Sequence, residues 1–292
     1  MSAADTTVSD EIAQLRVRQG GGGWRHDARS VGVVWRRELI AFWRNRTRIL
    51  IAFIQPLLYL FVLGTGLSVV IPSPGDFNYR TFMFPGVLAL AVLFPSLFSA
   101  GTIVFDREFG FMREMLVAPI RRGTIVVGKC LGGATVAALQ GSLLLVFAGL
   151  VGVPYDVVLF AQLILMLLLL SFALVAFGVM AAARVQSFQS FQAVLQIAVF
   201  PMLFLSGAMF PLHGLPTWLQ VLTRLDPITY AVDPMRRAVF AHLDVPQELR
   251  NDLDPGVTWF GWHVPTALEL LIVLLMGLVM LGIGIKRFRA LD

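Results

Sequence analysis

The sequence contains few charged residues, and this scarcity excludes a water-soluble domain. Of its 292 residues only 14% are charged and 57% are hydrophobic, whereas a soluble domain carries about 25% charged residues. Cysteine is almost absent, since a single Cys130 excludes a disulfide within the chain. The four histidines, at 26, 213, 242 and 263, are too scattered to predict a metal site. The composition is therefore that of an integral membrane protein.

Long runs without charge predict where the chain crosses the membrane. A helix that spans a bilayer needs roughly 20 apolar residues. Charge-free runs cover 49–75, 81–105, 130–155, 157–183, 185–223 and 270–285, and the last helix is expected to begin before Glu269. The sequence therefore predicts an all-α integral membrane protein with six transmembrane helices, in a transmembrane domain over 49–289.

The distribution of basic residues predicts the orientation of these helices. Nine Lys or Arg precede residue 49, five lie over 107–129, one is Arg184 and three are C-terminal, so 18 of the 23 fall in alternate loops. Loops rich in Lys and Arg face the cytoplasm, which predicts cytoplasmic N- and C-termini. The net charge of +5 then reflects contact with anionic lipids of the inner leaflet rather than nucleic-acid binding. Arg outnumbers Lys by 21 to 2, which suggests a GC-rich bacterial genome and a bacterial plasma (inner) membrane.

The first 48 residues divide into a tail and a helix. Residues 1–27 are expected to form a flexible cytoplasmic tail, because they include a run of four glycines. Residues 28–48 have a helical pattern. Its apolar face holds Val31, Val34, Trp35, Leu39 and Phe42, and its basic face holds Arg29, Arg36, Arg37 and Arg44. This pattern predicts an amphipathic interfacial helix on the inner membrane surface. The alternative is an ordinary basic flank with this pattern by chance.

The run over 185–223 is too long for one crossing and contains Pro201, Gly207, Pro211 and Pro216. We expect a fifth span followed by re-entrant external helices at about 210–242, where irregular backbone must be buried in protein or line a wet cavity. Asp226 and Asp233 are placed to cap these helices. An apolar stripe expected to face the membrane is formed by Trp218, Leu219, Leu222 and Leu225.

The stretch from Gly123 to Lys129 has the glycine and lysine spacing of a phosphate-binding loop. The next residue is Cys130, however, where such a loop has Ser or Thr to hold Mg²⁺, and a thiol is a poor magnesium ligand. We therefore expect no ATP site in this chain, and we expect Lys129 to extend its ammonium to the membrane interface.

Small residues at intervals of four predict close helix packing in the third span. They are Gly128, Gly132, Gly133, Ala137 and Gly141. In membranes such residues let helix backbones approach each other.

The loop after the second span predicts a further helix, at about 105–118. Phe105, Phe109, Met112 and Leu116 fall within about 60° of arc at 100° per residue. A short helix with an apolar stripe suits either a groove in a partner protein or a lipid surface, and the pattern does not choose between them. Within the predicted spans only Glu269 is ionisable, which argues against a carrier that powers itself with ions.

Two segments carry a resemblance to a known family. "FDREFGFMREMLVAPIRR" and "PMLFLSGAMFPLHGLPTWLQVLTRLDPITYAVDPMRRAV" resemble the membrane subunit of a type-2 ABC exporter, in particular the daunorubicin-resistance and nodulation-factor permease branch. The first segment is similar to the coupling helix that docks on a separate ATPase. The implied contacts with the ATPase are Phe105, Glu108, Phe109, Gly110, Met112, Arg113, Glu114, Leu116, Ala118, Pro119 and Arg121.

The resemblance also implies the assembly and the energy source. Family members work as two permease subunits with two ABC ATPase subunits, so a homodimer or a paired permease is expected. ATP and Mg²⁺ would be bound by the partner ATPase, and no cofactor by this chain. The implied activity is export of an amphipathic drug, lipid or lipid-linked glycan, and the cargo itself is not identified.

Polar residues in the spans are candidates for a substrate path. Gln189, Gln192 and Gln196 form a stripe at i, i+3 and i+7 on the fifth span, and Gln55 precedes Pro56 in the first. Hydrogen bonding between helices is the alternative role for each of them. Glu269 would contact substrate or pair with an outer arginine such as Arg236, and pairing is favoured.

Two other functions remain as alternatives. An ion-driven or passive transporter would work without an ATPase, and a membrane enzyme acting on lipids would need a clustered acid, base or metal set. Neither accounts for the predicted cytoplasmic helix.

Overall fold

A computed structural model describes residues 24–70, 79–110, 122–209, 216–243, 256–259 and 262–289. The helices of these residues are α2 (Trp24–Arg44), α3 (Arg46–Leu58), η1 (Tyr59–Leu63), α4 (Gly64–Val70), α5 (Tyr79–Glu108), α7 (Arg122–Leu143), η2 (Leu144–Val151), α8 (Val157–Ala182), α9 (Phe188–Leu205), α10 (Thr217–Thr223), α11 (Thr229–Ala241) and α13 (Thr266–Arg289). Two short strands, β1 (Thr258–Trp259) and β2 (Trp262–His263), pair antiparallel. Residues 1–23 of the tail expected over 1–27 lie outside the described residues, and residues 24–27 belong to α2.

Among the described residues, six helical stretches are long and apolar enough to cross a membrane, which confirms the predicted number. They are Ile49–Val69, Tyr79–Glu108, Gly123–Val151, Val157–Ala182, Phe188–Leu205 and Thr266–Phe288. Several bounds differ from the predicted runs. The third span begins before Lys129, and the run over 185–223 divides into α9 and the separate α10, because charge-free length does not show where a helix ends.

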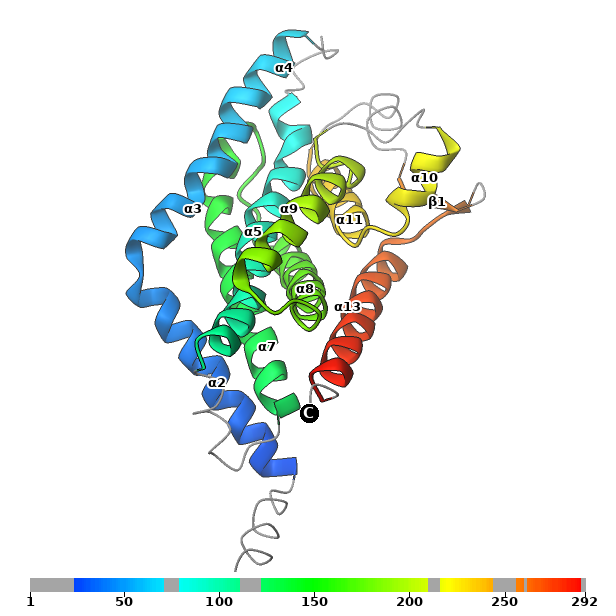
Figure 1. The fold of residues 1–292 in the computed structure, drawn as a ribbon. Helices are drawn as coiled ribbons and strands as arrows, with labels where there is room; N and C mark the ends of the chain where they lie inside the picture. Colours follow the sequence, from blue (N-terminus) through cyan, green and yellow to red (C-terminus); the bar gives the residue numbers. More distant parts are fainter. Residues whose placement is uncertain are drawn as a thin grey trace, which may run out of the picture.

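The centre of the molecule is the helix α5 (Figure 1), which packs against α7 and α8. Helix α13 packs on α8, and α2 packs on α7. Close approach at the centre depends on small residues. A Cβ atom added to Gly86 of α5 would lie 2.0 Å from the carbonyl oxygen of Ala208, so no larger residue fits there without a backbone shift.

The predicted packing residues of α7 face two different neighbours. Cβ atoms added at Gly133 and Gly141 would lie 2.0 Å from Ser99 Oγ and 2.5 Å from Val92 Cγ1, both on α5. Gly128 and Gly132 instead face α2. Ala137 is fully buried. The expectation that all these residues serve contacts between membrane spans is therefore wrong for Gly128 and Gly132.

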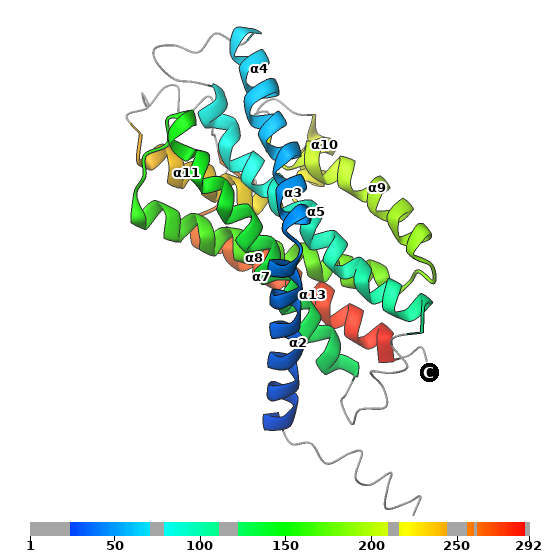
Figure 2. The ribbon, with the colours of Figure 1, turned by 90° about the vertical axis from the view of Figure 1, so that its left-hand side faces the viewer.

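The amphipathic helix begins and ends earlier than predicted, at Trp24 and Arg44. Its apolar face lies on protein: a Cβ atom at Gly128 would lie 2.8 Å from Val34 Cβ, and Trp35 Nε1 donates a hydrogen bond of 3.1 Å to Thr135 Oγ1. The face predicted to contact lipid is thus partly used by α7. Asn45 separates α2 from α3, and the chain bends there in Figure 1, whereas α2, α3 and α4 follow one line in Figure 2.

The first span is irregular because Pro56 lies inside α3. Proline has no N–H to donate to the carbonyl four residues earlier. A π-helical turn, η1, follows at Tyr59–Leu63, and such turns are frequent at functional sites. This irregular stretch is the one that carries Gln55.

The region between the fifth and sixth spans combines an exposed helix with a buried one. On α10 and just after it, Trp218, Leu222 and Leu225 are exposed. Helix α11 is buried along most of its length and packs against α5, α8 and α13. Asp226 accepts a hydrogen bond of 3.0 Å from Ile228 N at the start of α11, whereas Asp233 lies inside α11. The prediction that Asp233 caps a helix is wrong.

Candidate functional site

Two cavities lie side by side between the first, second and fifth spans. The larger has a volume of about 810 Å³ and is lined mainly by α3 and α5. The smaller has a volume of about 260 Å³ and reaches α9. Gln55, Phe94 and Phe98 line both cavities. The two cavities therefore share part of their walls and together make up one candidate site, and the volume of the larger is within the range of about 300–1,000 Å³ that is usual for ligand pockets.

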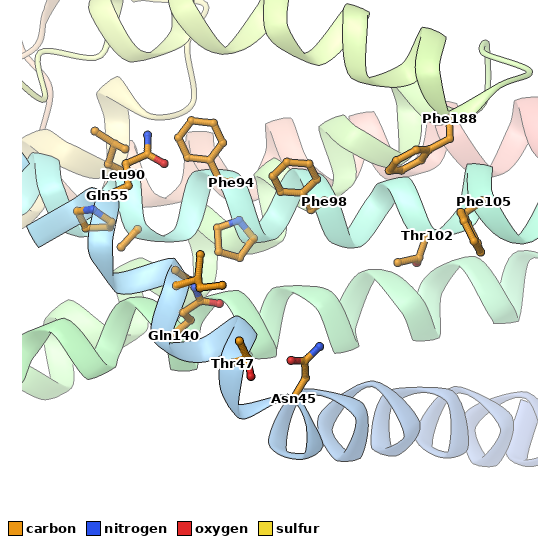
Figure 3. Close-up of a pocket in the computed structure, with 15 residues that line it drawn as sticks. Asn45, Thr47, Gln55, Leu90, Phe94, Phe98, Thr102, Phe105, Gln140 and Phe188 are labelled. Carbon is orange, nitrogen blue, oxygen red and sulfur yellow. The ribbon is translucent and has the colours of Figure 1, made fainter. Parts of the chain in front are cut away.

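Aromatic rings form the apolar wall of this site. Phe94, Phe98 and Phe105 lie four and seven residues apart on α5, so a helix places them on one face. Phe188, at the start of α9, completes the row (Figure 3). Rings of this kind present large, flat apolar surfaces to a ligand.

Uncharged polar groups are distributed along the same walls. The larger cavity contains the side chains of Asn45, Thr47, Gln55, Thr102 and Gln140 (Figure 3). The smaller contains Gln192 and Gln196. Among the described residues that line either cavity, none is Asp, Glu, Lys, Arg or His. Amides and hydroxyls can both donate and accept hydrogen bonds, so the site suits a ligand with apolar and hydrogen-bonding parts.

The structure brings together three of the five residues predicted for a substrate path. Gln55, Gln192 and Gln196 line the smaller cavity. Gln189 is exposed on α9 and does not line either cavity. Glu269 is buried in a different cluster, described below. Sequence reasoning missed Gln140 and the row Phe94, Phe98 and Phe105, although the spacing of that row was a readable signal.

A buried ion pair lies beside the end of the larger cavity that Thr102 lines. The Lys129 ammonium donates to the Asp106 carboxylate and, at 3.3 Å, to Thr102 Oγ1, and Thr102 lines the cavity. Only 3% of the Lys129 side chain is exposed. The prediction that Lys129 extends to the membrane interface is wrong, because α7 begins earlier than expected and carries this residue inward. Ionisable groups in the spans are thus not limited to Glu269.

The predicted coupling segment is described only at its start. Phe105 and Glu108 belong to the last turn of α5, which ends at Glu108. Gly110 has a φ of 80°, so the prediction of one continuous helix over about 105–118 is wrong at this point. Phe109 is exposed. Met112, Arg113, Glu114, Leu116, Ala118, Pro119 and Arg121 lie outside the described residues.

Glu269 pairs with an arginine, but not with the one predicted. Arg237 Nη2 lies 2.8 Å from Glu269 Oε1 and 2.6 Å from Asp233 Oδ2. Arg236 instead donates to Gly207 O at 2.6 Å, and its guanidinium lies 4.0 Å from the centre of the Phe82 ring. This cluster ties α11 to α13.

Two buried carboxyl groups between the fifth and sixth spans, Asp233 and Asp226, have opposite pKa shifts. Burial by itself would raise the pKa of Asp233, but hydrogen bonds with Arg237 and Glu269, the charge of Arg237 and the hydrogen bond from Val257 N outweigh it and lower the pKa. Burial raises the pKa of Asp226 to about 8, against the opposing hydrogen bond from Ile228 N. Within the described part of the chain, Asp226 Oδ2 has no hydrogen-bond partner, and no group of three or more His, Cys, Asp or Glu could hold a metal ion.

Six apolar helices among the described residues, with an aromatic and amide-lined cavity between the first, second and fifth spans, indicate a multi-pass membrane protein of the transport permease class. The family model of the ABC-2 type transporter matches residues 29–240, and the chain belongs to this family. It is similar to nodulation protein J from Rhizobium leguminosarum bv. trifolii, at 32% identity over 72% of this chain and 80% of that protein.

Two further relatives are similar to this chain over a comparable length. Nodulation protein J from Rhizobium meliloti (strain 1021) is 33% identical over 70% of this chain and 78% of that protein. A protein described as a transport permease, ycf38, from Cyanophora paradoxa is 30% identical over 70% of this chain and 72% of that protein.

Proposed function

We propose that this chain is the membrane-spanning subunit of an ATP-driven exporter in the bacterial plasma membrane. A separate ABC ATPase, in two copies, would bind ATP and Mg²⁺ and supply the energy. Membership of the ABC-2 type transporter family supports this proposal, as does similarity to a relative described as a transport permease. The N- and C-termini would face the cytoplasm, in agreement with the basic loops.

The single observation that carries the proposal is the cavity between α3, α5 and α9. Its row of phenylalanines would hold the apolar part of a cargo, and its amides and hydroxyls would hold the polar part. This combination suits an amphipathic cargo, such as a drug, a lipid or a lipid-linked glycan. Gln55, Gln192 and Gln196 would contact it.

The second permease subunit would be another copy of this chain. The helices α3 and α9 present many exposed apolar side chains, among them Ile54, Leu58, Ile197 and Phe200. Such faces are covered either by lipid or by another protein in a membrane. In a homodimer these helices and the cavity beside them would border the partner subunit, so the cargo path would lie near the interface.

The ATPase would contact the last turn of α5 and the residues that follow it. Those named by the resemblance are Phe105, Glu108, Phe109, Gly110, Met112, Arg113, Glu114, Leu116, Ala118, Pro119 and Arg121. Closure of the ATPases on ATP would move this segment, and the attached spans would open the cavity to the outside.

Co-purification with the partner ATPase tests the proposal. The wild-type chain is compared with a Glu114→Ala, Leu116→Asp double variant, which removes one charge and one apolar contact from the loop. The control is Val157→Asp, an acidic substitution at an 83% exposed position in the first turn of α8, where the helix dipole favours negative charge. We expect the double variant to lose the ATPase and the control to retain it. Undiminished association of the double variant would remove this loop from the mechanism.

An ion-driven transporter is the second candidate, favoured only by the buried Asp106–Lys129 pair. Buried ionisable groups can carry protons or ions through membrane proteins. Here each charge faces an opposite charge, which neutralises the pair. Transport that persists after ATP is depleted, and that stops when the ion gradients collapse, would favour this second candidate.

A further inference from the structure

The inner end of α5 is attached directly to the inner end of α9. Glu108 Oε2 accepts a hydrogen bond of 2.7 Å from the backbone N–H of Phe188, across 80 positions of sequence. Phe188 is the first residue of α9, and the first four N–H groups of a helix have no partner within it. Ser187 Oγ accepts from Ser190 N at 3.2 Å. The start of α9 is therefore capped by its own serine and by a carboxylate from another span.

Aromatic and backbone contacts support the same attachment. The ring centres of Phe105 and Phe188 lie 6.1 Å apart and the planes are nearly perpendicular, at 88°, which is a favoured geometry for aromatic pairs. One turn earlier on α5, a Cβ atom at Gly101 would lie 2.9 Å from the Phe191 ring. We call the contacts of Gly101, Phe105 and Glu108 with Phe188 and Phe191 the α5–α9 clasp.

The α5–α9 clasp lies between the segment proposed to meet the ATPase and the cavity proposed to hold the cargo. Glu108 is the last residue of α5, directly before the segment proposed to meet the ATPase. Phe105 and Phe188 line the inner end of the larger cavity. Further along α9, one and two turns from Phe188, Gln192 and Gln196 line the smaller cavity. A displacement of the end of α5 therefore reaches cavity residues through a single helix.

Among the described residues, few others contact α9. Only 22% of its most apolar window is buried, compared with 72% for α5. The first turn of α9 is fixed to α5 by the Glu108 hydrogen bond together with the ring contacts of Phe188 and Phe191. The neighbouring Arg107 donates to Ala182 O at 3.4 Å, so the same turn of α5 also touches the end of α8.

We propose that Glu108 is a positioning residue that transmits movement from the ATPase side of α5 to α9, instead of being a contact with the ATPase. This inference rests on the proposed function and deepens it. The Glu108 carboxylate already accepts a hydrogen bond from Phe188 N–H within the chain. Without this hydrogen bond, a movement of α5 would no longer be passed fully to α9.

The experiment uses the permease with its partner ATPase, reconstituted in nanodiscs. Since Cys130 is the sole cysteine, Cys130→Ser gives a cysteine-free parent. Ile197→Cys on α9, at a position that is 76% exposed and that does not line either cavity, carries a bimane fluorophore. The emission shift caused by ATP and vanadate reports movement of α9, while trapped nucleotide and ATPase co-purification are measured on the same sample.

Three variants are compared in this parent. Glu108→Ala removes the acceptor, and Glu108→Gln keeps an oxygen that can accept from Phe188 N. Asp156→Ala is the matched control, because Asp156 Oδ1 caps α8 through Val158 N and Leu159 N at 2.8 and 2.9 Å and has no link to α5. We expect Glu108→Ala to retain the ATPase and its trapped nucleotide but to lose at least half of the emission shift. We expect Glu108→Gln and Asp156→Ala to keep that shift.

The outcomes separate the inference from the proposed function. Release of the ATPase by Glu108→Ala would make Glu108 a partner contact and overturn the inference. A full emission shift in Glu108→Ala would overturn it as well, as would an equal loss of shift in Asp156→Ala. If the parent itself traps no nucleotide with any ATPase, the proposed ATP-driven function fails, and the inference fails with it.

Discussion

The helices of this permease divide into a closely packed group and an open group, although both are apolar enough to cross a membrane. Of the most apolar windows of α5, α7 and α8, 72%, 50% and 61% are buried within the chain. For the first span and for α9 the values are 17% and 22%, while their hydropathies of 2.0 and 1.6 still suit a membrane. Hydropathy therefore predicts which helices enter a membrane, and small residues such as Gly86, Gly133 and Gly141 predict which helices pack on one another.

The largest expected effect is in the packed group, at the Asp106–Lys129 pair. Lys129→Met would leave the Asp106 carboxylate buried without its partner, at a cost of about 3–5 kcal/mol. Replacing both residues, as in Asp106→Asn with Lys129→Met, should cost less than the single Lys129→Met. The measurement is the midpoint of thermal unfolding in detergent, followed by size-exclusion chromatography. A double variant less stable than Lys129→Met would contradict the pairing.

A glycine pair compares the two groups directly. Gly86→Ala puts a methyl group against the Ala208 backbone, whereas nothing lies within 4 Å of the corresponding position at Gly66 on α4. We expect Gly86→Ala to destabilise the fold by up to about 3 kcal/mol, and Gly66→Ala to be neutral or slightly stabilising. Thermal unfolding of both variants checks this contrast. Equal midpoints would show that α4 is packed as closely as α5.

The pKa of Asp226 predicts a pH dependence of stability in the buried region between the fifth and sixth spans. Its pKa is raised to about 8, so the folded state holds a proton that the unfolded state releases above about pH 4. Stability from this group is fully present below pH 4 and is lost as the pH rises through 8. Between pH 6 and 7.5 the loss is about 2 kcal/mol.

Asp226→Asn should remove this part of the pH dependence, because the amide does not titrate. Urea or thermal unfolding of both proteins at pH 6 and 7.5 measures the difference. Parallel curves for the wild type and Asp226→Asn would contradict a raised pKa.

The smallest effect on stability, with a clear effect on transport, is expected in the open group. Gln192→Leu removes a polar group from the cavity, and Gln189→Leu makes the same change on the exposed side of the same helix. We expect Gln192→Leu to lower the rate of ATP-dependent transport about tenfold, which corresponds to about 1.4 kcal/mol, with unfolding unchanged. Gln189→Leu should transport normally. Equal loss in both variants would place the cargo path elsewhere.

The sequence predicted features that depend on local patterns, and it failed where distant segments meet. The six spans follow from charge-free length, and Gln192 and Gln196 follow from helical spacing. The Asp106–Lys129 pair joins two helices whose packing depends on the position at which α7 begins, which charge-free length did not show. Arg236 and Arg237 are adjacent in sequence, and only the rotation of α11 against α13 decides which of them reaches Glu269.

The bend between α2 and α3 lies at one end of the larger cavity. Asn45, at the bend, and Thr47, just beyond it, both form part of the cavity wall. Contacts at Gly128 and Gly132 and the Trp35–Thr135 hydrogen bond hold α2 on α7. A change in the angle between α2 and α3 would therefore move Asn45 and Thr47 relative to the aromatic row on α5, so the width of this end of the cavity depends on that angle as well as on the residues that line it.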